Sequence, residues 1–146
     1  MPFKSDQFIV GMIAVFTINQ LRRHPQIHNN NRTRDRKRRP FICYAERNGF
    51  SYWTPLTGSE KRRSRTIDGK WLLVPKGARF TRPCVMVYDG KSSFVGPVQV
   101  FAELSFKYDR YRGFRRPFVY GPGVDELKSI VTERRGLIPS PLRMAA

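Results

Sequence analysis

Apolar runs alternate with basic, Gly- and Pro-containing segments along the chain, and the longest run is residues 8–18. It is rich in β-branched and aromatic residues and contains Gly11, which favours a buried strand over a helix. Its eleven residues are too few to cross a bilayer, since that takes about 20. The run also lacks the basic start and the small-residue cleavage site of a signal peptide, so we expect a cytoplasmic protein.

Two strand-like runs, residues 41–46 and 50–56, are separated by the dipeptide Asn48-Gly49. This dipeptide supplies the two positive-φ residues of a type I′ turn, so the two runs predict a β-hairpin. A two-residue turn at this place pairs Tyr44 with Trp53 and Arg38 with Ser59. The start and the end of the stretch 38–59 are therefore expected to lie side by side.

Shorter apolar runs extend the β pattern. Three of them predict further strands, at residues 71–75, 82–88 and 117–120. In residues 98–106 apolar positions alternate with mostly polar ones, which predicts a half-exposed strand. Leu127, Ile130 and Val131 recur at helical spacing, and Gly136 provides a stop. The pattern predicts a mainly β fold (α+β) with one C-terminal helix.

The length of 146 residues fits one compact domain, which we place at residues 1–136. A Pro-containing tail follows at 137–146 and is expected to fray. Segments with many basic side chains and little to bury predict three basic loops, at residues 19–39, 60–70 and 107–116.

The chain has a large excess of positive charge. It has 28 Lys and Arg residues against 11 Asp and Glu residues, a formal net charge of +17. Such a balance predicts a polyanionic partner, with nucleic acid the first choice. Membrane headgroups are also anionic, but the basic clusters lie in Gly- and Pro-broken loops without a long amphipathic helix, which argues against a membrane partner.

Residues 107–118 interleave basic with aromatic side chains. This mixture suits base stacking and phosphate contact on single-stranded RNA, and it equally suits a loop whose aromatic rings plug one end of a barrel. The residues that we expect to bind RNA are Arg34, Arg36, Lys37, Arg62, Arg63, Arg110, Tyr111, Arg112, Arg115 and Arg116.

Cysteine and tryptophan usage points to structure rather than chemistry. Cys43 and Cys84 lack the paired spacing of zinc or redox sites, so we expect buried thiols. Trp53 and Trp71 are expected in the core or at a dimer contact.

The two histidines, His24 and His28, have i, i+4 spacing. On a helix this spacing would suit a metal, but Pro25 breaks a helix there and no third ligand is near, so we expect no metal and no cofactor. Because imidazole exchanges a proton near neutral pH, both histidines are candidate proton carriers.

The predicted hairpin brings guanidinium groups beside the hydroxyls of Thr57 and Ser59, with Lys61 just beyond. Arginine offers a planar fork of donors to phosphate oxygens and hydroxyls add further donors, so these residues outline a phosphate site. The alternative is an ordinary turn at residues 57–59 next to a solvated charge run.

Several of these motifs together resemble the MazF/PemK/Kid toxin superfamily. They are an Arg-Pro start to an apolar strand, a hairpin partner that ends Pro-Leu-Thr-Gly-Ser, a preceding apolar strand with a glycine, and a C-terminal helix. The Pro-Leu-Thr-Gly-Ser-Glu-Lys element is also similar to the ToxN-type branch. The resemblance implies a small SH3-like β-barrel of about six to seven strands, a homodimer, and an endoribonuclease held in check by an antitoxin that is a protein or an RNA.

The resemblance also implies site residues and a reaction. Arg39 matches the catalytic arginine before proline, Thr57 the hydroxyl residue that closes the neighbouring strand, and Ser59 and Lys61 the ToxN-type pattern. The implied reaction is metal-independent cleavage of single-stranded RNA by attack of a ribose 2′-hydroxyl on its own phosphodiester. Because arginine stays protonated, charge stabilisation and proton donation are the roles expected for Arg39.

Strict alternation along the hairpin puts Arg38, not Arg39, on the face of Thr57 and Ser59, unless a bulge reverses the register. Arg38 therefore stays a candidate catalytic residue. The main alternative function is a non-catalytic RNA- or DNA-binding β-barrel, since a charge of +17 alone gives salt-sensitive, sequence-independent binding. An interaction domain of a phage or ribonucleoprotein particle would also explain the charge.

Overall fold

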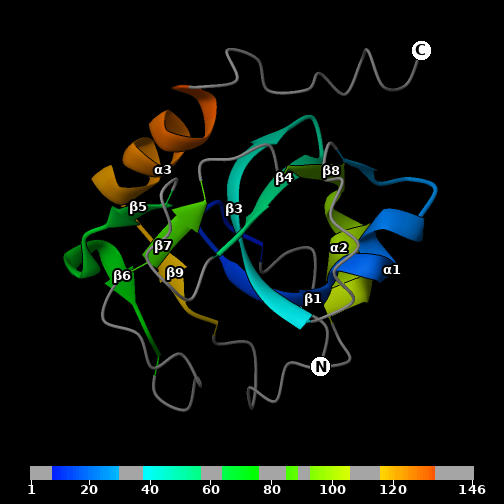
Figure 1. The fold of residues 1–146 in the computed structure, drawn as a ribbon, viewed down its shortest axis with the longest axis horizontal. Helices are drawn as coiled ribbons and strands as arrows, with labels where there is room; N and C mark the ends of the chain where they lie inside the picture. The colour runs from blue at the N-terminus through cyan, green and yellow to red at the C-terminus, as the bar shows by residue number, and fades with distance from the viewer. Residues whose placement is uncertain are drawn as a thin grey trace.

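The computed structural model describes residues 8–29, 38–56, 64–75, 85–88, 93–105 and 116–133 (Figure 1). The predicted tail at 137–146 lies outside these residues. In chain order the elements are β1 (Ile13–Thr17), α1 (Ile18–Arg23), β2 (His28–Asn29), β3 (Arg38–Arg47), β4 (Phe50–Pro55), β5 (Ser64–Ile67), the 3-10 turn η2 (Gly69–Trp71), β6 (Leu72–Leu73), β7 (Val85–Tyr88), β8 (Phe94–Pro97), α2 (Val98–Leu104), β9 (Phe118–Val119) and α3 (Pro122–Glu133).

An antiparallel five-stranded sheet in the order β1-β3-β4-β8-β2 forms the centre of the fold. Two ribbons, β5-β7 and β6-β9, are attached to it by single bridges, Leu56 to Val87 and Met12 to Phe118. The mainly β fold with a C-terminal helix is therefore confirmed. Within the described residues the strands do not close into a barrel, so the expected SH3-like barrel is not confirmed.

Both faces of the β3-β4 pair are buried, each in its own apolar cluster. The first cluster, which includes Phe41, Cys43 and Trp53, is covered by α1 and α2. The second cluster, which includes Ile42 and Tyr52, is covered by α3 and by the two ribbons. Figure 1 shows these coverings on opposite sides of β3 and β4. Trp53 is fully buried, as expected for a core residue.

The predicted hairpin is present, but its register differs from the expected one. Asn48 and Gly49 have φ values of 53° and 82°, as the predicted turn requires. The pairing shifts by one residue between Cys43 and Ala45, so Trp53 lies opposite Cys43 and not opposite Tyr44. The cause is a β-bulge at Tyr44, which leaves both Tyr44 and Ala45 in the second cluster.

Residues 98–104 form helix α2, so the prediction of a half-exposed strand there was wrong. Phe101, Ala102 and Ser105 are buried and Val98 packs against the first cluster, which gives the spacing i, i+3, i+4 and i+7 of a helix face. Ser105 is the C-cap of the helix, and its hydroxyl donates to the carbonyl of Ala102, 2.8 Å away. The alternation of apolar and polar positions in this segment therefore does not reflect a strand.

Two of the predicted basic loops are partly regular structure. Residues 18–23 form α1, whose Ile18 and Leu21 are buried one helical turn apart in the first cluster. In the predicted loop 60–70, residues 64–67 form β5 against β7. In both segments a few apolar residues are enough for regular structure to form, although the many charged residues around them indicated a loop. Among the described helices, none is long and apolar enough to cross a membrane.

Gly11 ties three segments together at the start of β1. Its N–H donates to the carbonyl of Cys43 at 2.8 Å, and its carbonyl accepts from the N–H of Val119 at 2.9 Å. Its φ is 99°, and a Cβ at this position would lie 2.1 Å from the carbonyl oxygen of Val119. Only glycine fits this junction between the sheet and the β6-β9 ribbon.

We expect Gly11→Ala to lower the free energy of unfolding by about 3 kcal/mol, since both the backbone conformation and the packing are violated. Gly49→Ala is the matched control, because Gly49 also has a positive φ but an added Cβ meets nothing within 4 Å. That control should cost about 1 kcal/mol. Urea unfolding of both variants measures the difference, and equal losses would contradict the packing role of Gly11.

Candidate nucleic-acid interface

The end of the sheet where β1 finishes and β3 begins is called the basic end below. In the register of these strands Phe16 pairs with Arg39 and Thr17 with Arg38. Arg39 shares a sheet face with Phe41 and the first cluster, and Arg38 lies on the opposite face. The side chain of Arg38 is exposed and that of Arg39 is half-buried.

The last described pair of the hairpin sits next to these arginines. The N–H of Leu56 donates to the carbonyl of Pro40, 2.9 Å away. Arg39 directly precedes Pro40, and Thr57 directly follows Leu56. The bulge at Tyr44 produces this arrangement, whereas the register expected from the sequence would have put Pro40 opposite position 57. Thr57, Ser59 and Lys61 themselves lie outside the described residues.

Other basic segments join the described structure at the same end. Residues 106–115 join at Arg116, next to Pro117, whose carbonyl accepts from the N–H of Ile13 at 2.9 Å. β9 runs antiparallel to the start of β1. The chain that precedes Pro117 therefore joins the structure on the side that faces the C-terminal end of β1. Residues 30–37 join at Arg38.

A further segment joins through the ribbons. Val87 bridges to Leu56, and β7 is antiparallel to β4 there, so Val85 lies on the side where β4 ends. Residues 76–84 are joined at Val85. Together, residues 30–37, 57–63, 76–84 and 106–115 carry fourteen of the 28 Lys and Arg residues and three of the 11 Asp and Glu residues. The topology thus brings one of the two attachment points of each of these segments to the basic end.

Most of the predicted RNA-binding residues belong to these segments and lie outside the described part of the chain. They are Arg34, Arg36, Lys37, Arg62, Arg63, Arg110, Tyr111, Arg112 and Arg115. Arg116 is described and is only 4% exposed. Its backbone precedes the contact of Pro117 with β1, which holds it against the sheet. Arg116 was expected to contact RNA, and in this structure its side chain is covered by protein.

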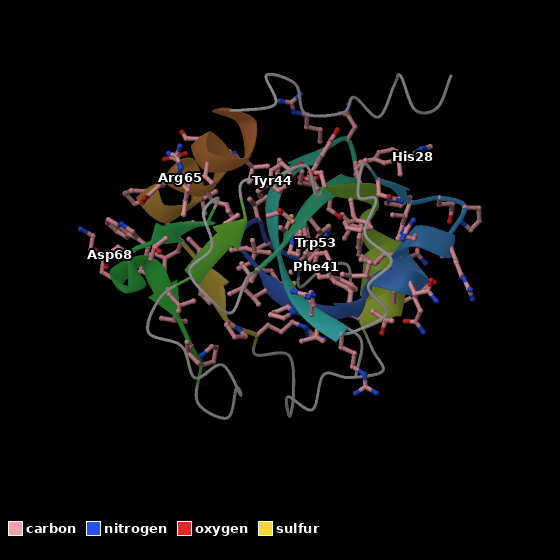
Figure 2. The ribbon with its side chains drawn as sticks, viewed as in Figure 1. His28, Phe41, Tyr44, Trp53, Arg65 and Asp68 are labelled. Carbon is pink, nitrogen blue, oxygen red and sulfur yellow. The ribbon has the colours of Figure 1, made fainter. Side chains whose placement is uncertain are left out.

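The two histidines occupy different places. His28 lies on β2, at the edge of the sheet. It pairs with Val95, Val95 pairs with Tyr52, and Tyr52 pairs with Ala45, near the hairpin turn. Ala45 is six residues from Arg39 along β3, which corresponds to about 20 Å. Figure 2 shows His28 at the margin of the molecule, away from Phe41. The structure therefore does not bring His28 to Arg39.

His24 follows α1. Its Nδ1 accepts a hydrogen bond from the N–H of Gln26 at 3.1 Å, so the neutral ring carries its N–H on Nε2. Among the described residues no group of three His, Cys, Asp or Glu side chains is placed to hold a metal ion.

Cys43 is a fully buried thiol in the first cluster, as expected from the sequence. Its Sγ donates to the carbonyl of Ala45 at 3.3 Å. Burial raises the pKa of this thiol from 9.0 to about 12. Cys43 is therefore no nucleophile at neutral pH. Cys84 lies outside the described residues.

The raised pKa of Cys43 predicts an alkaline loss of stability. The unfolded thiol ionises above pH 9 and the folded one does not, so stability that is complete below pH 9 is lost between pH 9 and about 12. Relative to a Cys43→Val variant, the wild type should lose about 1 kcal/mol between pH 8 and 10. Urea unfolding at both pH values measures this, and parallel behaviour of the two proteins would refute it.

A second group of side chains was given no binding role by the sequence analysis. Lys70, Trp71 and Tyr120 lie together beside the β6-β9 ribbon. Lys70 and Tyr120 are exposed, whereas Trp71 is half-buried and packs against the second cluster. The signal was present in residues 118–120, where Phe118 and Tyr120 flank the buried Val119. Such alternation places both rings on the outer face of a strand.

Comparison with known proteins gives no relative for this chain: no protein-family model, no curated protein and no solved structure matches it.

Proposed function

We propose that this protein is an RNA-cleaving enzyme whose site lies at the basic end, with Arg39 as its central cation. The observation that carries the proposal is the hydrogen bond from Leu56 to Pro40. Because Pro40 pairs with Leu56, Arg39 and Thr57 each directly adjoin this pair in the sequence, which supports Arg39 over Arg38 as the arginine of the site. This agrees with the arginine that the resemblance to MazF-type toxins selects and disagrees with strict alternation, which selects Arg38.

The proposed reaction needs no metal ion. A ribose 2′-hydroxyl attacks the adjacent phosphorus, the bond to the 5′-oxygen of the next nucleotide breaks, and the products carry a 2′,3′-cyclic phosphate and a 5′-hydroxyl. Negative charge grows on the equatorial oxygens in the transition state. The guanidinium of Arg39 stabilises that charge, and the hydroxyls of Thr57 and Ser59 together with Lys61 supply further donors. A base outside this set takes the proton of the 2′-hydroxyl, and a second group delivers a proton to the departing 5′-oxygen. His24, whose Nε2 carries a proton, is the remaining histidine candidate for the second role.

The proposal extends to the MazF/PemK/Kid superfamily and its SH3-like barrel. It rests on the motifs within residues 38–61, together with the mainly β architecture and the C-terminal helix. In this proposal the protein is a homodimeric, cytoplasmic toxin that an antitoxin neutralises.

A second candidate function is non-catalytic binding of RNA or DNA. It is favoured by the spread of fourteen basic residues over four segments, which is wider than a single scissile phosphate requires. Such a distribution neutralises many phosphates and gives sequence-independent, salt-sensitive affinity.

RNA cleavage in excess EDTA distinguishes the two functions. We expect discrete fragments with cyclic phosphate ends from a long single-stranded RNA. Arg39→Ala should slow their formation by about 100-fold, the usual effect of removing one transition-state donor, and should leave RNA binding nearly intact. Arg38→Ala is the matched control, because it removes an equal charge from the other face and should slow cleavage less than about threefold.

Intact RNA together with tight, salt-dependent binding would refute the enzyme and favour the binding module. Loss of cleavage in Arg38→Ala but not in Arg39→Ala would show that the register argument selects the wrong arginine.

A further inference from the structure

The outer face of the β6-β9 ribbon is apolar although it is exposed. Leu72 and Val119 pair and point inward to the second cluster. Leu73 and Phe118 pair on the opposite face, where Leu73 is 45% exposed. Tyr120 follows on that same face. An outer face of an antiparallel ribbon is ordinarily polar, so this one is a candidate contact surface.

The aromatic rings on this face are held in place before any partner arrives. Trp71 and Tyr120 meet edge to face with ring centroids 5.9 Å apart, and Phe118 and Tyr120 meet at 6.3 Å. The hydroxyl of Tyr120 donates to the carbonyl of Lys70 at 2.9 Å. Trp71 packs against Gly123, where an added Cβ would lie 2.5 Å from the Cβ of Trp71. Fixed rings lose little conformational entropy when a flat partner stacks on them.

The cluster also carries a positive charge. The Nζ of Lys70 lies 5.2 Å from the centroid of the Trp71 ring. The N–H of Lys70 donates to the carboxylate of Asp68 at 2.9 Å, which closes the 3-10 turn and orients this residue. Figure 2 shows Asp68 at the extremity of the molecule opposite to His28. The turn thus presents an ammonium group beside one exposed ring, Tyr120, and two half-buried rings, Trp71 and Phe118. This combination suits a base and its neighbouring phosphate.

Both strands of the ribbon lead into basic segments. Residues 76–84 follow β6 after Pro75, and residues 106–115 precede β9 before Arg116. Phe118 pairs with Met12, so Tyr120 lies level with position 10 of the chain, and Arg39 pairs with Phe16. Tyr120 and Arg39 are therefore six positions apart along the strand direction, or about 20 Å. A single RNA strand of several nucleotides can span this distance.

We propose that Trp71, Phe118 and Tyr120, with Lys70 beside them, form a stacking site for bases of single-stranded RNA, separate from the site of Arg39. The inference rests on RNA as the partner of the proposed function, and it adds a contact that holds the strand away from the scissile phosphate. Stacking is tolerant of sequence, since every base has a π face. The site therefore selects single strands over duplexes rather than one sequence over another.

The test measures binding of a fluorescently labelled, 2′-O-methylated single-stranded RNA, which cannot be cleaved by 2′-hydroxyl attack. Tyr120→Leu should weaken binding about tenfold, a typical loss for one stacked base. Tyr120→Phe keeps the ring and removes only the hydroxyl, so its affinity should stay within about twofold of the wild type. Binding of a duplex of the same sequence should be unchanged in both variants.

Salt dependence separates the roles of the two side chains. The slope of log affinity against log salt should be unchanged in Tyr120→Leu, because no phosphate contact is lost. The slope should fall by about one in Lys70→Gln, which removes a single cation at the surface and is expected to fold.

The proposal is overturned if Tyr120→Leu, folded as judged by its thermal unfolding, binds the single strand as the wild type does. It is also overturned if single strand and duplex weaken equally. A variant that dissociates an oligomer without changing RNA affinity would instead assign this face to a second copy of the chain. Because the RNA cannot be cleaved, none of these outcomes depends on whether Arg39 is catalytic.

Discussion

Burial of the β3-β4 pair on both faces is the constraint on which the remaining structure depends. Phe41 and Cys43 face one cluster, and Ile42 with Tyr44 and Ala45 faces the other. Two successive residues can face the same side only where the ladder is interrupted, so the bulge at Tyr44 follows from the packing. The bulge then shifts every pair between Tyr44 and the basic end by one position. A demand of the core thereby decides which of two adjacent arginines lies beside the exit from β4, several residues away.

The hairpin turn and the C-terminal helix could be predicted from local sequence signals, whereas the bulge could not. Asn48-Gly49 determines a turn by its own backbone preferences, and the face of α3 repeats over enough residues to be distinctive. Residues 41–45 are apolar without interruption, so a shift of one position contradicts no hydrophobic pattern. Residues 98–105 fit both a period of two and a period of 3.6, and the burial of Phe101 and Ser105 distinguishes the helix from the strand.

The candidate site was predictable as chemistry and not as geometry. Net charge and the arginines at 38 and 39 were evident, because composition and motifs are local properties. The convergence of distant segments at the basic end depends on long-range pairs such as Ile13 with Pro117 and Leu56 with Val87. Such pairs join residues far apart in the chain, and no local sequence pattern indicates them. The same long-range order carries His28 to the far edge and covers Arg116, and neither outcome follows from residue type.

Catalysis and binding place different demands on this surface. In the proposed reaction, charge stabilisation at one phosphate requires that Arg39 is held within a fraction of an ångström. The β-strand that carries Arg39 is paired at Phe16 and supplies a rigid backbone for it. Affinity for a long strand depends on summed charge and on stacking, which tolerate loose geometry. The described structure separates these demands in space, with the arginine on the central sheet and the aromatic rings on the attached ribbon. The ribbon joins the sheet through Gly11 and the bridge at Met12. If RNA binds as proposed, the strength of that junction sets how firmly a strand held on the rings is aligned with Arg39.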